Sequence, residues 1–314
     1  MTSISEFNAF KKQFIEKYKN VITQRVMLFE DERKKQLSKT KTINIVGIIF
    51  SIIVLPLAFR FIQPEDIEAL IVTLFVSFMP WLIAGTIIGH IFLKFETKIK
   101  VLIMPAICSC FGELVWSQKE YDGFRIIDAA SFLPRYSRVD YDDIFKGTYK
   151  DTPFQIVETK LEEKQGKHTV TVFDGVIVRI KMNKEFSGHT VVKTDSLLKL
   201  DIPIGSKLRH TTLEDVEFEN KFDVYTTDEI EARYLLTPAF MEKINLLETV
   251  FRTNCVRCAF YKQEFFLALD GCGDLFEVAN LNSPLDDPKP YYALFDDIVS
   301  VLNLIEYFKL TENN

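Results

Sequence analysis

The sequence lacks the short motifs by which many enzymes are identified. It contains no GxSxG, no HExxH, no glycine-rich phosphate loop and no dinucleotide-binding fingerprint. Its four histidines, His90, His168, His189 and His210, have no catalytic or metal-binding partner at a typical spacing. We therefore predict no particular reaction and no cofactor, and we favour binding over catalysis.

Cysteine is scarce, and its number is odd. The five residues are Cys108, Cys110, Cys255, Cys258 and Cys272. An odd set does not indicate a disulfide framework, so we expect reduced thiols in the cytoplasm. Cys255 and Cys258 have the spacing of a metal knuckle, and Cys272 is a third candidate ligand. On an extended strand, however, residues three apart point to opposite faces, and no second CxxC or nearby His completes four ligands. We predict no metal site.

Clustered positive charge is missing from most of the chain. Residues 1–42 carry ten Lys and Arg against five Asp and Glu, whereas residues 95–314 carry 26 against 36. Because nucleic acids are bound by clustered basic side chains, the acidic larger part argues against nucleic acid as a partner. The basic N-terminal part suits an anionic membrane surface instead. Scattered acids such as Asp140, Asp142, Asp143 and Asp151 could serve a metal-dependent enzyme, but acids in loops are usually solvated, and we interpret them in that way.

Two long hydrophobic runs are the strongest positive signal. Residues 43–62 and 69–93 each supply the roughly 20 apolar residues that cross a bilayer, and the acidic segment QPEDIE separates them. Lys and Arg cluster before the first run and after the second, so the positive-inside rule places both termini in the cytoplasm. The first run starts too far into the chain for a cleavable signal peptide. We predict three parts: a cytoplasmic amphipathic helix over 1–42, a transmembrane hairpin over 43–94, and a cytoplasmic domain over 95–314.

Small residues in the two runs indicate a packing face. Gly47 and Ser51 form a small-xxx-small pair in the first run, and Gly85 and Gly89 form another in the second. One interpretation is that the two pairs pack against each other within the hairpin. The other is that Gly85 and Gly89 mediate dimerisation.

The remainder of the chain predicts an α+β fold. Before the hairpin, apolar residues from Phe7 to Leu28 recur at three- and four-residue steps, which indicates an amphipathic helix. After it, a segment over 101–114 is too short and too broken for a third span. Period-two alternation predicts a half-buried strand over 176–182, with bends at 173–175 and 186–188. Further strands are expected over 189–192, 218–225, 256–260 and 265–269, with helices after Asp228 and Thr237 and a closing helix over 291–310.

Two stretches of the cytoplasmic part resemble the bacterial DUF3137 family, a domain of unknown function. They are FDGVIVRIKMNKEFSGHTVV (173–192) and VEFENKFDVYTTDEIEARYLLTPAFMEKI (216–244). The second is the more specific, through Phe218, Phe222, Val224, Tyr225, Asp228, Glu231, Ala232, Arg233, Tyr234, Leu236, Thr237, Pro238 and Met241. The resemblance covers roughly residues 95–310, and a preceding membrane hairpin is typical of the family. It implies a bacterial inner-membrane protein but supplies no activity, and the three cysteines from Cys255 onward are not part of its pattern.

The polar residues of the second stretch are the candidate site. Asp228, Glu231, Arg233 and Tyr234 could bind a ligand or a partner. Helix capping by Asp228, with Glu231 reciprocating from the third helical position, explains the two acids without a ligand. Arg233 could pair with a carboxylate in the fold.

These observations favour a membrane-anchored cytoplasmic interaction or regulatory module. It would be a multi-pass protein that binds a protein partner or self-associates, and the amphipathic helix would be available for that contact. The alternative is a membrane-tethered enzyme or ligand sensor with a polar cleft near Asp228, Glu231 and Arg233.

Overall fold

The structure is a computed structural model that describes residues 4–61, 67–118, 121–194, 207–253, 255–273, 275–278 and 281–309. The chain divides into two compact units. The sheet unit comprises Met1–Lys11, Cys108–Phe276 and Phe295–Asn314, and the hairpin unit comprises Lys12–Ile107 and Glu277–Leu294. Residues 62–66, which include most of the predicted acidic loop, lie outside the described residues, as does Leu310 at the end of the predicted closing helix.

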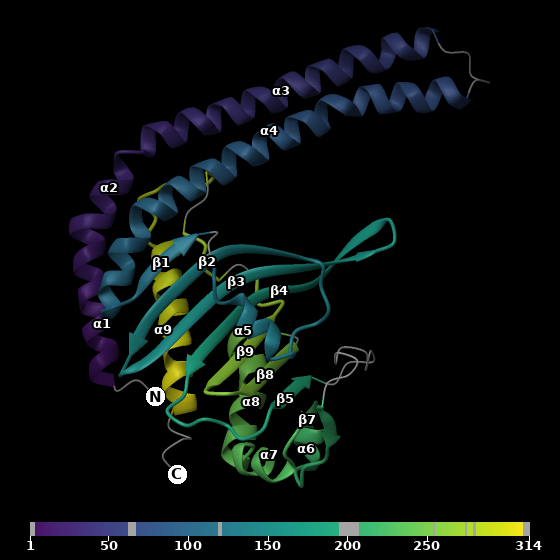
Figure 1. Ribbon diagram of the computed structural model, residues 1–314. Helices are drawn as coiled ribbons and strands as arrows, with labels where there is room; N and C mark the ends of the chain where they lie inside the picture. Colours follow the sequence, from purple (N-terminus) through teal and green to yellow (C-terminus); the bar gives the residue numbers. More distant parts are fainter. Residues whose placement is uncertain are drawn as a thin grey trace. The chain divides into compact units, whose positions relative to one another are not determined.

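The described part of the sheet unit contains nine strands. They are β1 (Val115–Gln118), β2 (Arg138–Tyr149), β3 (Thr152–Gln165), β4 (His168–Lys181), β5 (Thr190–Thr194), β6 (Arg209–Thr211), β7 (Phe222–Thr226), β8 (Cys255–Tyr261) and β9 (Glu264–Asp270). They form one sheet in the order β1-β2-β3-β4-β9-β8-β5-β7-β6, and neighbouring strands are antiparallel (Figure 1). The expected α+β class is confirmed, and so is the strand pair formed by β8 and β9.

Helices make up most of the remaining described chain. They are α1 (Ile4–Lys17), the π-helix η1 (Tyr18–Ile22), α2 (Thr23–Met27), α3 (Glu30–Phe61), α4 (Ile67–Cys108), the 3-10 helix η2 (Ser109–Phe111), α5 (Phe124–Ala129), α6 (Val216–Glu219), α7 (Glu229–Leu235), α8 (Pro238–Phe251) and α9 (Lys289–Lys309). Thr237 caps α8, and Pro238 occupies its first position, as predicted.

Apolar side chains cover both faces of the central strands. On one face, Ile177 and Phe266 belong to a core that includes Ile127 of α5. On the other, Phe265 contacts Phe240 of α8 and Phe308 of α9, with ring centroids 6.0 and 4.6 Å away. The sheet therefore lies between two apolar layers, and alternate residues of one strand serve different cores.

Strand β4 differs from the sequence-based expectation in two ways. Residues 173–175 lie inside the strand rather than in a bend. Gly175 faces the neighbouring β9 so closely that a Cβ there would collide with the main-chain oxygen of Leu269. The glycine thus permits close approach of two strands. In addition, Ile177 and Val178 are both buried, so this part of β4 is covered on both faces rather than one.

The predicted strand over 218–225 is also corrected. Residues Val216–Glu219 form the short helix α6, which Asp215 caps by accepting a hydrogen bond from the Phe218 amide at 3.0 Å. The strand β7 begins only at Phe222. Phe218 and Phe222 stack with centroids 4.7 Å apart, so both aromatic rings are buried although only one lies on the strand.

In the hairpin unit, α3 and α4 lie side by side (Figure 1). They contain 32 and 42 residues, which corresponds to about 48 and 63 Å of helix. Both are long and apolar enough to cross a membrane, by length and composition. Large apolar side chains such as Ile52 and Phe78, at 66% and 61% exposure, point away from the protein. The segment after the second hydrophobic run continues α4 as far as Cys108, and Ile103 and Ile107 are fully buried within it.

The small residues of the two helices are arranged unequally. The Ser51 hydroxyl lies 3.0 Å from the Gly47 carbonyl oxygen and 3.2 Å from that of Ser77 on the facing helix, and it accepts a hydrogen bond from the Trp81 indole at 3.0 Å. Gly47 is buried, whereas Gly85 and Gly89 are exposed. At all three positions an added Cβ would have no atom within 4 Å. The contacts of Ser51 with Ser77 and Trp81 join α3 to α4, and the Gly85–Gly89 face is exposed in this single chain.

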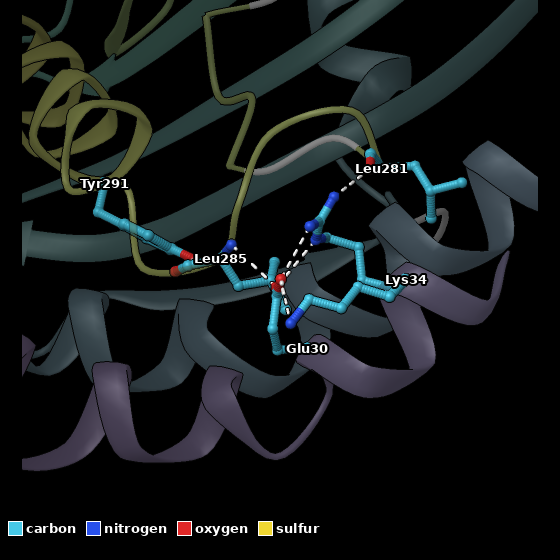
Figure 2. A network of polar contacts seen from close by, with 6 residues as sticks. Glu30, Lys34, Leu281, Leu285 and Tyr291 are labelled. Atoms are coloured by element: carbon cyan, nitrogen blue, oxygen red, sulfur yellow. Dashed lines mark hydrogen bonds and ion pairs between the residues drawn. The ribbon is translucent and has the colours of Figure 1, made fainter. Parts of the chain in front are cut away.

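A buried ion pair fixes the start of α3. Arg33 donates to both carboxylate oxygens of Glu30 at 2.8 Å and to the Leu281 carbonyl at 2.7 Å. Glu30 also accepts from the Leu285 amide at 3.3 Å, and the Lys34 ammonium lies 3.8 Å from its carboxylate. Figure 2 shows these contacts meeting at Glu30. The hydrogen bonds from Arg33 lower the pKa of Glu30 below its usual value. The pair connects α3 to the segment before α9 within the hairpin unit.

The amphipathic helix before the hairpin packs on its own chain. In the sheet unit, Phe7 contacts Phe295 and Phe10 contacts Phe111, with centroids 6.4 and 5.3 Å apart. In the hairpin unit, Phe14 is fully buried and meets Tyr292 edge-on at 5.0 Å. The apolar face of α1 is therefore already occupied, which removes one reason for expecting a separate protein partner.

Candidate functional site

The turn between β7 and α7 is built around Asp228. Its carboxylate accepts from the amides of Ile230 and Glu231 at 3.0 and 3.1 Å, which confirms the predicted N-cap. The predicted return contact from the Glu231 side chain to the Asp228 amide is wrong. That amide donates instead to the Thr226 hydroxyl at 3.1 Å.

Glu231 holds a different segment. Its two carboxylate oxygens accept from the main-chain amides of Ser187 and Gly188, at 2.8 and 2.5 Å, and the residue is 9% exposed. Gly188 fits there because an added Cβ would lie 2.8 Å from the Cβ of Asp228. The two acids of the motif thus tie the connection between β4 and β5 to the start of α7.

Arg233 and Tyr234, the other two candidates, lie on exposed positions of α7 and line a cavity of about 760 Å³. Asp228 and Glu231 are not among its lining residues. The cavity is formed by Met182, Asn183, Lys184, Phe186, Arg233, Tyr234, Leu235, Thr237, Pro238, Ala239, Phe240, Phe260, Phe265 and Phe308. Its size is within the range of small-molecule sites, which is about 300–1,000 Å³.

The cavity has an aromatic floor. Phe240 lies 5.4 Å from Phe260 and 5.3 Å from Phe308, and Phe186 meets Phe260 edge-on at 5.3 Å, measured between ring centroids. These rings are at most 6% exposed, and Phe265 beneath them is fully buried. These close aromatic contacts fix the positions of the rings in the floor, and the rings favour an apolar occupant.

The rim of the cavity is basic. Lys184 and Arg233 are the charged lining residues, and none of the lining residues is acidic. The Lys184 ammonium lies 4.9 Å from the centre of the Tyr234 ring, a cation–π contact. Within the part of the chain that the structure describes, neither Lys184 nor Arg233 forms an ion pair. The expected pairing of Arg233 with a carboxylate is therefore not observed there.

The cysteines and His189 occupy separate structural positions. Cys258 is fully buried in the middle of β8, where desolvation raises its pKa, and Cys255 is the half-buried first residue of the strand. The Cys272 thiol donates to the Leu269 carbonyl at 3.4 Å, and burial raises its pKa to about 11. His189 bonds the Ala130 carbonyl oxygen at 2.7 Å, and burial lowers its pKa. Thiols held protonated in this way are poor nucleophiles.

An acidic cluster lies at a bulge in β2. Carboxylate oxygens of Asp142, Asp143 and Glu158 lie within 4.8 Å of one another. Asp143 is fully buried and accepts from the Trp116 indole at 2.6 Å, while Glu158 accepts from the Leu275 amide at 3.1 Å. Asp143 is thus a packed strand residue rather than the solvated loop acid that the sequence suggested.

Comparisons with known proteins identify part of the chain. No curated protein matches it. Among solved structures, the crystal structure of the mycobacterial trehalose monomycolate transport factor A, TtfA, matches 62% of this chain and 88% of its own, with 8% sequence identity and a TM-score of 0.33. We infer nothing from a likeness at that score. The family model for "Protein of unknown function (DUF3137)" matches residues 171–310, which include Asp228 and all the lining residues of the cavity. Residues 171–310 of the chain are therefore similar to the DUF3137 family.

Proposed function

We propose that the protein is a membrane-anchored cytoplasmic module that binds rather than catalyses. The observation that carries the membrane anchor is the pair α3 and α4, whose large apolar side chains are exposed along lengths sufficient to cross a bilayer. Such a surface is unfavourable in water and favourable in lipid. The two contacts that Ser51 makes with Ser77 and Trp81 of α4 would hold the two helices together in the bilayer.

The orientation follows from charge. Lys and Arg flank the outer ends of both hydrophobic runs, and the connection between the runs is acidic. The positive-inside rule then places both termini and the DUF3137 domain in the cytoplasm of a bacterial cell, at the inner membrane.

Membrane extraction tests the anchor. We expect the full-length protein to stay in the membrane pellet after washing with alkaline carbonate and to be released only by detergent. The matched variant replaces exposed Ile48, Ile52 and Phe78 by lysine, which places charge in the hydrocarbon and should prevent insertion. Release of the unaltered protein by carbonate would contradict the proposal.

The binding role is proposed to include self-association or a membrane protein partner. The open face at Gly85 and Gly89 supports this, because a second helix could approach it closely. We expect the protein purified in mild detergent to be oligomeric by light scattering, or to retain a partner. Gly85→Leu with Gly89→Leu should dissociate it, whereas Ile52→Leu should not. A wild-type monomer without a partner would contradict this part of the proposal.

A second candidate function is ligand sensing by the DUF3137 domain. It is favoured by the cavity beside α7, which Arg233 and Tyr234 line. The cavity differs from the polar cleft that the sequence predicts near Asp228, Glu231 and Arg233. Asp228 and Glu231 accept hydrogen bonds from main-chain amides and do not line the cavity. A ligand for this cavity would meet aromatic rings and basic side chains.

A further inference from the structure

We propose that the cavity beside α7 binds a single-chain amphiphile with an anionic head, either a carboxylate or a phosphate. The proposal gives a ligand class to the sensing function and rests on that second candidate, not on the membrane anchor. All the residues involved belong to the sheet unit, so the site would exist even if the hairpin did not span a bilayer.

The apolar part of the cavity suits an alkyl chain. The aromatic floor consists of Phe186, Phe240, Phe260 and Phe308, with Met182 beside them. The whole cavity has a volume of about 760 Å³. Since burying one methylene contributes about 0.8 kcal/mol, each added methylene should raise affinity about fourfold until the cavity is filled. A purely polar ligand would leave these rings without favourable contacts.

The polar part of the cavity suits an anion. Lys184 and Arg233 contribute two positive charges to a rim that contains no acidic lining residue. Arg233 also lines a neighbouring cavity of about 420 Å³, together with Glu214 and Asp215. Helix α8, of 14 residues, begins at the same rim, since Thr237, Pro238 and Ala239 line it, and a helix N-terminus carries partial positive charge. Carboxylate and phosphate both match this arrangement, with Arg233 able to bind either in a bidentate manner.

The two parts line one cavity, so one molecule with both features can occupy it. Lys184 lies over the Tyr234 ring, and Tyr234 lines the same cavity as Phe240 and Phe308. The aromatic floor and the basic rim therefore belong to a single space. Charge complementarity is the reason for preferring an anionic amphiphile over a neutral one.

Photolabelling of the full-length protein in phosphatidylcholine nanodiscs tests the proposal. The probe is dodecanoate with a terminal diazirine, and labelled peptides are located by mass spectrometry. We expect labelling in the peptide that contains Phe240, with displacement by unlabelled dodecanoate and by dodecyl phosphate. Because charge-assisted hydrogen bonds to the head are absent for an alcohol, dodecanol should compete at least about tenfold more weakly. Octanoate should also compete more weakly than dodecanoate.

Four variants separate the proposal from non-specific labelling. Lys184→Gln and Arg233→Gln should each raise the half-saturating probe concentration at least about fivefold, because each removes one rim charge. Ala239→Trp, at an exposed lining position, should block the cavity and abolish labelling. Lys181→Gln is the control, since Lys181 is exposed nearby but does not line the cavity. Circular dichroism of each variant should match the wild type.

Several results would overturn the proposal. Labelling spread over many peptides, or unchanged by Ala239→Trp, would show that the cavity is not the site. Equal competition by dodecanol would remove the role of the basic rim. Suppression of labelling by phosphatidylglycerol nanodiscs, but not by dodecanoate, would assign the cavity to a bilayer lipid. None of these results depends on carbonate extraction, so this proposal and the anchor can fail separately.

Discussion

Glu231 connects the segment between β4 and β5 to helix α7, and its removal should destabilise the sheet unit. In Glu231→Ala, the amides of Ser187 and Gly188 lose acceptors at 2.8 and 2.5 Å. A hydrogen bond to a charged group contributes about 1.5–3 kcal/mol, and water can partly replace it because Ser187 is exposed. We therefore expect a loss of about 3 kcal/mol in the free energy of unfolding.

Thermal unfolding measures this loss. For a unit of about 200 residues, each kcal/mol lowers Tm by about 2–4 °C, so Glu231→Ala should lower Tm by about 6–12 °C. Glu231→Gln, which keeps one acceptor oxygen, should lose about half as much. Amide hydrogen exchange should also show lost protection at Ser187 and Gly188, while the strands of the sheet retain theirs.

Two control substitutions separate this effect from changes in helix stability. Glu229→Ala, at an exposed position in the first turn of the same helix, should change Tm by less than about 2 °C. Asp228→Ala removes the N-cap of α7 and should lower the free energy of unfolding by about 1 kcal/mol. If Glu231→Ala is no more destabilising than Glu229→Ala, the assigned role of Glu231 is wrong.

Three further substitutions test other parts of the structure. Gly175→Ala should lower the free energy of unfolding by about 1–3 kcal/mol, measured with a chemical denaturant, because the added Cβ would displace the main chain at Leu269. An unchanged free energy of unfolding would refute the close approach of the two strands. Burial raises the pKa of Asp297 from 3.8 to about 6. Between these two pH values the folded protein holds a proton that the unfolded chain has lost. The free energy of unfolding therefore falls as pH rises through that window. Asp297→Asn should remove the fall and, after allowance for partial exposure, stabilise the protein by about 1 kcal/mol at neutral pH; an unchanged pH profile would contradict this. Arg33→Met should cost about 3–5 kcal/mol, because Glu30 would remain buried without its partner, and adding Glu30→Gln should restore part of the loss; a double variant as unstable as the sum of the single ones would argue against pairing.

Local signals in the sequence were sufficient for several elements. The capping residues Asp228 and Thr237 fix where α7 and α8 begin, because each bonds amides only two or three residues away. The strand pair β8 and β9 was predicted for the same reason, since a short turn joins two apolar runs. The two apolar helices follow from composition and length alone.

Other features depend on residues that are distant in the sequence. Gly175 suggested a bend, but the close approach of β9, over ninety residues later, keeps it in a strand. Glu231 suggested a capping box, but its partners lie 44 and 43 residues earlier. A motif can therefore indicate important residues correctly and still give their partners wrongly.

The cavity beside α7 could not be predicted for the same reason. Its lining comes from four separate segments, represented by Lys184, Arg233, Phe260 and Phe308. Arg233 and Tyr234 were candidates from the motif, whereas Lys184 and the aromatic floor were missed. The abundance of phenylalanine, 28 residues in all, was the only sequence signal for such a floor, and it did not indicate a location.

The central claim is that α3 and α4 form a membrane hairpin with the DUF3137 domain in the cytoplasm. Protease access to an epitope inserted between residues 65 and 66, compared with one at the C-terminus, tests it most directly. We predict that protease added to intact bacterial spheroplasts removes the inserted epitope, while the C-terminal epitope is cleaved only after lysis. Protection of both epitopes until lysis, or cleavage of both before it, would contradict the account.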